Sequence, residues 1–275
     1  MVNLTEEKRD ELVAHILHSK KYRDLNIPPA TVTDLLALEA EKHSSSRALV
    51  KAVRQKLHNI VASYLGDPDY HAAARCLEKA FATGKDEEVR LACSRLLGMH
   101  ASTRERLPVL AEFYETLFDA IGQPRVIIDL ACGLNPLALP WMNLPVTTKY
   151  WAYDLHQPRV DMLNSFFALQ GLEPLARHQD ILVEPPQVEA DVAFFFKEAH
   201  RFEQRQKGCN RAFWQAVRAR MLVVTLPAVS LTGRHNLADK HRNLVYSAIG
   251  DLPWHVNELC VGTELIFCID KGYGA

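Results

Sequence analysis

Two short apolar runs, each ending beside a carboxylate, limit the folds open to this chain more than any other feature. The first run, VIIDLACGLNP, covers residues 126–136 and passes from a β-branched segment into a tight turn that contains Gly133. The second, YWAYD, ends in Asp154, about 20 positions after that glycine. In Rossmann-like sheets the glycine lets the backbone approach a nucleoside closely, and the second acid binds the ribose hydroxyls. The pattern therefore predicts a Rossmann-like α/β core with a nucleoside site at this turn.

The turn lacks the glycine pattern of dinucleotide-binding proteins. No G-x-G-x-x-G motif is present, and Gly133 is the single glycine of the turn. Because such a turn offers no pyrophosphate cradle, it favours S-adenosylmethionine as the ligand. A buried strand and turn that bind no ligand are the alternative interpretation.

The chain divides into two parts with different patterns. Helical patterns fill residues 1–107, and from residue 125 strands alternate with helices, as a parallel sheet requires. We therefore predict an all-helical N-terminal domain at 1–107 and a Rossmann-like methyltransferase domain at 108–275. Helices are expected at 5–19 and 47–65, up to Ala82, after Asp86, and from Ser102 towards Ala120, the last opened by a capping box between Ser102 and Glu105. Strands are expected at 125–130, 149–153, 175–179, 191–197, 221–226, 254–260 and 263–270.

The segment 47–64 predicts an amphipathic helix with a basic stripe. Its apolar side chains fall within about one third of the helix circumference: Leu49, Val50, Val53, Leu57, Ile60 and Val61. The adjoining stripe, which contains no acid, consists of Arg47, Lys51, Arg54 and His58. A second basic cluster consists of Lys20, Lys21 and Arg23. Two interpretations stay open: a solvated helix face, or a phosphate-binding face that acts by arrangement and not by bulk charge.

Composition narrows the class of protein. The formal net charge of −1 excludes a globally basic nucleic-acid binder but allows a local basic face. The six cysteines are scattered, without a C-x-x-C pair or a short-spaced Cys/His cluster, which argues against structural zinc and favours reduced cytosolic thiols. The N-terminal segment carries charges and no apolar signal-peptide core, and no stretch is apolar enough to span a membrane. We therefore expect a cytoplasmic protein.

Four blocks of sequence carry a resemblance to a known family. They are HASTRERL at 100–107, DLACGLNPLA at 129–138, SKKY at 19–22 together with VRQKLH at 53–58, and VGTELI at 261–266. In these blocks the chain resembles the 16S ribosomal RNA guanine-N7 methyltransferases that confer aminoglycoside resistance. The resemblance implies a helical RNA-binding domain before a Rossmann-like S-adenosylmethionine-dependent core. It also implies methylation of N7 of guanine 1405 in the decoding site of the 30S subunit.

The resemblance implies a set of residues that bind S-adenosylmethionine: Tyr64, His100, Ala101, Ser102, Arg106, Ala131, Gly133, Asp154, Asp180, Ile181 and Phe196. Among these, Arg106 would hold the methionine carboxylate, Asp154 the ribose hydroxyls and Asp180 the exocyclic amine of adenine. Structural roles are the alternative for three of them: Tyr64 in a core, Ser102 as a helix cap and Asp180 in a turn.

The resemblance also implies a set of RNA-binding residues: Lys20, Lys21, Arg47, Lys51, Arg54 and Arg234. These side chains would bind phosphates and position the protein without reading sequence. The partner would be 16S rRNA within the assembled 30S subunit, recognised by its folded shape, with one guanine flipped from its stack.

The resemblance breaks after the fifth expected strand. LPAVSLTGR at 226–234 is similar to the family's F-P-x-x-S-L-G-G-R, but HNLADKHR at 235–242 does not match the G-M-E-x-N-Y run that follows there. KEAH at 197–200 also departs from the family's more apolar K-L-L. Both segments follow strands at the side where a target base would bind, so the departures concern the target nucleotide and leave cofactor binding intact.

Methyl transfer to guanine N7 makes few chemical demands on the protein. N7 carries a lone pair and no proton, so a direct displacement needs alignment and no general base. We therefore expect no catalytic acid or base, no metal and a monomeric enzyme. Two alternatives remain open: a small-molecule methyltransferase on the same fold, which would not use the basic stripe, and a catalytically silent ribosome-binding relative, suggested by the altered segment 235–242.

Overall fold

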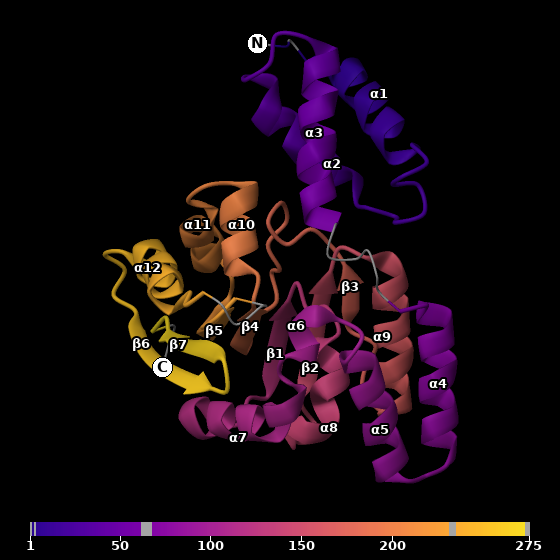
Figure 1. The fold of residues 1–275 in the computed structure, drawn as a ribbon, viewed down its shortest axis with the longest axis vertical. Coiled ribbons are helices and arrows are strands. Elements are labelled where there is room, and N and C mark those ends of the chain that lie inside the picture. The colour runs from indigo at the N-terminus through magenta and orange to yellow at the C-terminus, as the bar shows by residue number, and fades with distance from the viewer. Residues whose placement is uncertain (1, 3, 62–67, 231–234, 273–275) are drawn as a thin grey trace.

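The computed structural model describes residues 2, 4–61, 68–230 and 235–272, which form a group of N-terminal helices and a sheet covered by helices (Figure 1). The first three helices, which pack around a core of their own, are α1 (Glu6–Leu17), α2 (Pro29–Ala40) and α3 (Ser46–Val61). The predicted apolar face of α3 is confirmed, because Leu49, Val53 and Leu57 are buried in this core. Thr5 caps α1 by accepting a hydrogen bond from the Lys8 N–H at 3.3 Å.

The seven-stranded sheet has the order β3-β2-β1-β4-β5-β7-β6. Its strands are β1 (Val126–Leu130), β2 (Lys149–Asp154), β3 (Ala176–His178), β4 (Ala190–Phe196), β5 (Ala219–Pro227), β6 (His255–Val261) and β7 (Glu264–Asp270). Strands β1 to β5 are parallel, and β7 runs antiparallel between β5 and β6. All seven predicted strands are present, and the predicted Rossmann-like α/β core is confirmed. The strand order reverses between β1 and β4, where such sheets open a crevice at their carboxyl ends.

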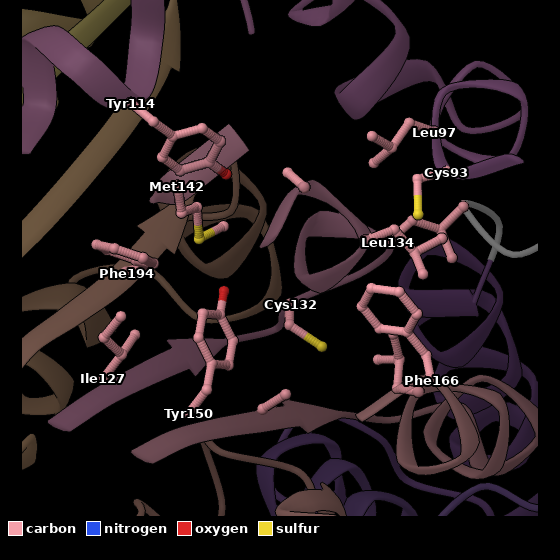
Figure 2. Close-up of a cluster of buried hydrophobic side chains, with 14 of the residues drawn as sticks. Cys93, Leu97, Tyr114, Ile127, Cys132, Leu134, Met142, Tyr150, Phe166 and Phe194 are labelled. Carbon is pink, nitrogen blue, oxygen red and sulfur yellow. The ribbon is translucent and has the colours of Figure 1, made fainter. Parts of the chain in front are cut away.

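Helices cover both faces of the sheet (Figure 1). One face packs against α4 (Tyr70–Ala82), α5 (Asp86–Leu97), α7 (Leu110–Ile121) and α9 (Gln157–Leu169). The other face packs against α10 (Ala199–Arg205), α11 (Cys209–Ala216) and α12 (Ala238–Ile249). The connections contain the short helices α6 (Ala101–Arg104), η2 (Leu107–Val109), η3 (Asn135–Ala138) and α8 (Leu139–Met142). Figure 2 shows part of the first core, where Cys93 and Leu97 of α5 and Phe166 of α9 lie around Leu134.

The helices of the N-terminal part divide between two cores. Helices α1 to α3 form a separate cluster, whereas α4 and α5 share the core of α7, α9 and the sheet. The domain boundary at residue 107 stays a prediction. In packing terms, the helices that carry the basic stripe form a group distinct from those that support the sheet.

One predicted helix start is wrong, and one helix was missed. The capping box between Ser102 and Glu105 does not form: α6 begins at Ala101 with His100 at its N-cap, and the helix towards residue 120 begins only at Leu110. The Ser102 hydroxyl bonds instead to Nδ1 of His100 at 2.7 Å, and Glu105 pairs with Lys197 at 2.7 Å. Helix α2 was not predicted, because Pro28 at its N-cap supplies no side-chain hydrogen bond.

Candidate active site

A pocket of about 830 Å³ opens where the carboxyl ends of β1, β2, β4 and β5 meet the end of α3 and the segment around α6. The predicted cofactor-binding residues that line it are His100, Ala101, Ser102, Arg106, Ala131, Gly133, Asp154, Asp180, Ile181 and Phe196. Tyr64 lies outside the described residues. Residues that are far apart in the sequence are thus brought to one cavity, at the place where the strand order reverses.

The turn after β1 has the backbone geometry of a ligand cradle. Ala131 and Gly133 both have positive φ, 52° and 55°. Such values cost little for glycine and more for alanine, and strained backbone of this kind collects at binding sites. A Cβ built on Gly133 would point towards the His100 ring, with Cε1 4.0 Å away across the pocket. The absence of a side chain here therefore leaves the turn open to a ligand.

Asp154 is fixed by contacts on both carboxylate oxygens. Oδ2 accepts from the Gly133 N–H at 3.0 Å and from Arg159 at 2.7 Å, and Oδ1 accepts from the His156 N–H at 2.9 Å. Arg159 in turn donates from Nε to the hydroxyl of Tyr70 at 2.9 Å. The carboxylate therefore ties the end of β2 to the Gly133 turn and holds a defined orientation towards the pocket.

Arg106 lies at the centre of a buried polar network. Its guanidinium forms two hydrogen bonds with Glu264, one of them from Nε at 3.1 Å, and donates to Oδ1 of Asn135 at 2.9 Å. The rings of Phe113 and Phe196 flank it, with centroids 4.1 and 4.7 Å from Cζ. Burial opposes ionisation of Glu264, but the cations of Arg106 and Lys197 hold its pKa below the usual range. These bonds use three of the five N–H donors of Arg106.

Behind this arginine, Asp129 is fully buried below the pocket. It accepts from Asn135 at 3.0 Å and from the Tyr150 hydroxyl at 2.7 Å. Burial raises its pKa to about 7, against the effect of those hydrogen bonds. Asp129 does not line the pocket, so it acts on the site through the orientation of Asn135 and Arg106.

Asp180 is joined to the N-terminal helices through one side chain. Arg205 of α10 donates to Oδ1 of Asp180 at 3.0 Å and pairs with Asp34 of α2 at 3.2 Å. Lys56 of α3 donates to the carbonyl of Arg205 at 3.1 Å, and Arg201 donates to the carbonyl of Ile60 at 3.2 Å. Burial acts to lower the pKa of Arg205, but the negative charge of the neighbouring Asp180 outweighs it and raises that pKa. The wall of the pocket therefore includes the interface between α2–α3 and α10.

The end of the pocket beyond β4 carries a different set of side chains. Glu198, His200 and His241 line it, and the two imidazole rings lie 5.8 Å apart between centroids. Burial raises the pKa of Glu198 to about 7. Burial and the neighbouring His241 lower the pKa of His200 to about 4, so His200 is neutral at physiological pH.

The predicted RNA-binding residues lie away from the pocket. Lys20, Lys21, Arg47 and Lys51 are exposed on the N-terminal helices and the turn after α1. Arg54 is half-buried, with Nη2 3.2 Å from Nε2 of His15. None of these five side chains lines the pocket, and Arg234 lies outside the described residues.

Sequence reasoning missed the partners of the predicted residues. Glu264, Arg205 and Arg159 each pair with a residue of the predicted set, yet Glu264 lies 158 positions from Arg106. The signals available were a glutamate inside the VGTELI block and an arginine, Arg159, in a segment rich in apolar residues; Arg205 lies in the mostly polar segment AHRFEQR. Such signals identify a partner only when the fold is known.

The described residues show no sign of a membrane span or a metal site. In that part of the chain, no helix combines the length and the apolar character needed to cross a membrane. Likewise, three or more histidine, cysteine, aspartate or glutamate side chains are nowhere grouped so as to hold a metal ion within the described ranges.

Comparisons with known proteins agree along nearly the whole chain. The family model described as ribosomal RNA methyltransferase (FmrO) matches residues 18–268. The 16S rRNA (guanine(1405)-N(7))-methyltransferase of Micromonospora echinospora is 34% identical, covering 97% of this chain and 98% of its own length. The protein of the same name from Serratia marcescens is 34% identical, with coverages of 95% and 98%.

Solved structures of 16S rRNA methyltransferases also resemble this chain along nearly its whole length. The 16S rRNA methyltransferase RmtF, crystallised with S-adenosyl-L-homocysteine, has a TM-score of 0.76 at 29% identity, covering 97% of this chain and 99% of that one. The 16S rRNA methylase RmtB has a TM-score of 0.75 at 31% identity, with coverages of 96% and 98%.

Replacing Arg205 with methionine should lower the free energy of unfolding by about 3–5 kcal/mol, because it leaves the carboxylates of Asp180 and Asp34 without their cation. The matched control is Arg242→Met, whose partner Glu258 lies at 2.7 Å but whose side chain is 39% exposed. That change should have little effect, because solvent screens an exposed ion pair. Urea unfolding of both variants measures the difference, and equal losses would contradict the structural role assigned to Arg205.

Proposed function

The chain belongs to the FmrO family of ribosomal RNA methyltransferases, and we propose that it methylates N7 of guanine 1405 in 16S rRNA within the 30S subunit. One observation carries the proposal: a single pocket is lined by the Gly133 turn, Asp154 and Asp180 and also by Glu198, His200 and His241, which follow β4 and β5. A cavity of this size has room for a nucleoside cofactor and a flipped base together. The enzyme acts as a cytoplasmic monomer and confers aminoglycoside resistance.

The residues at the Gly133 end fit S-adenosylmethionine. The open Gly133 turn and Ala131 lie beneath the methionine and ribose, and the fixed carboxylate of Asp154 accepts from the ribose hydroxyls. Asp180 and Ile181 border the adenine. This cofactor supplies an electrophilic methyl group on a sulfonium centre.

The methionine carboxylate would be held at the other side of this end. Arg106 has N–H donors beyond the three that bind Glu264 and Asn135, and His100 and Ser102 lie beside it in the same wall. Phe196 lines the pocket at the end of β4. Tyr64, placed by the resemblance, closes over the cofactor.

The protein contributes alignment and no proton transfer. Guanine N7 offers a free lone pair, so the displacement proceeds without a general base, and Asp154 and Asp180 act as binding residues. The side chains around the pocket hold the base and the methyl group in line and exclude water.

RNA binding belongs to the exposed basic residues of the N-terminal helices. Lys20, Lys21, Arg47, Lys51 and Arg54 bind phosphates of the folded 30S surface, and Arg234 belongs to the same set by its place in the sequence. The first four are exposed, so they can reach RNA phosphates without a rearrangement of the protein.

Primer extension on 16S rRNA, after borohydride reduction and aniline cleavage at N7-methylguanine, tests the proposed reaction directly. Purified enzyme, S-adenosylmethionine and 30S subunits should give one methylated position, guanine 1405, and expression in a susceptible bacterium should raise resistance to gentamicin and kanamycin but spare neomycin-type drugs. A methyl group with a fixed positive charge repels polycationic drugs that dock there. A methyl mark at another nucleotide would refute the assigned target, and transfer only to small molecules would refute RNA as the substrate.

Asp154→Asn should weaken binding of S-adenosyl-L-homocysteine by about 10- to 100-fold, because the amide replaces an acceptor-only carboxylate towards the ribose hydroxyls. Asp161→Asn, an exposed change on α9, is the matched control and should bind as the wild type does. Isothermal titration calorimetry measures both. Equal affinity for the three proteins would mean that the ribose is placed wrongly.

Charge reversal of Lys51 and Arg54 to glutamate should abolish 30S binding and leave affinity for S-adenosyl-L-homocysteine unchanged, because neither side chain lines the pocket. Lys79→Glu with Lys85→Glu reverses two exposed charges on α4 and at the N-cap of α5 and serves as the control. Wild-type binding should weaken with salt by about one log–log unit for each phosphate neutralised. Salt-independent binding would contradict the electrostatic mechanism.

A further inference from the structure

The strand order places the end of β4 between the two ends of the pocket. In the sheet, β4 lies between β1, whose turn carries Gly133, and β5, which leads to Pro227 and Ser230 (Figure 1). Side chains just after β4 therefore lie where a bound cofactor and an incoming base would meet. The first of these residues are Lys197 and Glu198.

These two residues turn to different partners. Lys197, with a positive φ of 59°, donates to the carbonyl of Ser102 at 3.0 Å and to Glu105 at 2.7 Å, and it pairs with Glu264 at 3.4 Å. Both residues line the pocket, but they have different partners, because Glu198 pairs with Arg201 at 3.4 Å. The ammonium of Lys197 is therefore held by the buried network, and the carboxylate of Glu198 lies outside that network.

Glu198 differs from the other carboxylates of the pocket wall. Four carboxylates line the pocket in the described residues: Glu105, Asp154, Asp180 and Glu198. The first three each have a cationic partner at 2.7 to 3.0 Å. Glu198 has its cationic partner, Arg201, at 3.4 Å, and its side chain is 23% exposed. Burial, and to a smaller extent the charge of Asp154, raises the pKa of Glu198 to about 7, although the cations of Arg201 and Arg159 act to lower it. It is thus the wall carboxylate with the most capacity left for further hydrogen-bond donors.

The sequence at this position is also distinctive. Glu198 and His200 stand in the KEAH segment, where the chain departs from the apolar K-L-L of the family it resembles. A carboxylate in place of an aliphatic side chain changes what this wall can bind. It adds two acceptor oxygens to the pocket that the neutral imidazole of His200 also lines.

We propose that Glu198 recognises the Watson–Crick edge of the target guanine, accepting hydrogen bonds from its N1–H and N2–H₂ groups. This inference rests on the proposed function, in which N7 of the flipped base points to the methyl group. When N7 points to the methyl group, the N1–H and N2–H₂ donors of the base need hydrogen-bond acceptors from the protein. A carboxylate matches their two donors, whereas it repels the N1 lone pair of adenine, so Glu198 selects guanine over adenine at the target position.

The test compares Glu198→Gln with the wild type and with Glu189→Gln, the same change at an exposed residue outside the pocket. Methyl transfer from tritiated S-adenosylmethionine is measured on 30S subunits with the natural guanine and on tagged 30S subunits with adenine at that position. For Glu198→Gln, kcat/KM on the guanine substrate should fall about 10- to 100-fold. Activity on the adenine substrate should hold or rise, because the glutamine amide can donate to N1 of adenine, so the guanine/adenine ratio falls. Affinity for S-adenosyl-L-homocysteine should stay unchanged.

Other outcomes overturn the inference in distinguishable ways. An unchanged guanine/adenine ratio, whether or not overall activity falls, would give Glu198 no part in recognising the base. A parallel loss of affinity for S-adenosyl-L-homocysteine would assign Glu198 to the cofactor end of the pocket. A wild-type enzyme that methylates neither 30S substrate would refute the proposed function itself, and the role of Glu198 with it.

Discussion

The buried carboxylate of Glu264 is the point on which the geometry of the site depends. It lies at the start of β7, pairs with Arg106 from the segment before α7, and reaches Lys197 at the end of β4. Two cations share this buried acid, and Glu105 supplies a second negative charge to Lys197. Burying such charged groups costs desolvation energy, so they add little to the net stability of the fold. Their main effect is to position the segments that carry them. They fix three separate chain segments around one corner of the pocket.

A second set of polar contacts joins the N-terminal helices α2 and α3 to the wall of the pocket. Arg205 connects Asp180 in the pocket wall to Asp34 on α2, and Lys56 and Arg201 add bonds between α3 and α10. A movement of α2 and α3 relative to the sheet would have to break these buried pairs. The position of α3 is therefore coupled to the Asp180 wall of the cavity through these hydrogen bonds and ion pairs.

The sequence predicts local features of this fold and fails where the answer depends on distant residues. The strands and the Gly133 turn follow from short apolar runs and one spacing to Asp154, so they were predicted. The capping box at Ser102 was wrong because Glu105 is drawn to Lys197, 92 positions away, a competitor that no local pattern reveals. The same reason hid Glu264 and Arg205, whose importance comes from partners on other elements. The roles of the predicted site residues stay predictions.

The two ends of the pocket are built by different physical means, and this fits the departures from the family motif at 197–200 and 235–242. The Gly133 end depends mainly on backbone: positive φ at Ala131 and Gly133, and main-chain N–H groups that orient Asp154 together with Arg159. Substitution there would strain the turn itself. The end beyond β4 is formed by side chains on α10 and α12, such as His200 and His241, whose exchange leaves the strands in place. Selection of a base can therefore change through residues such as Glu198 while the cofactor cradle remains as the sheet dictates.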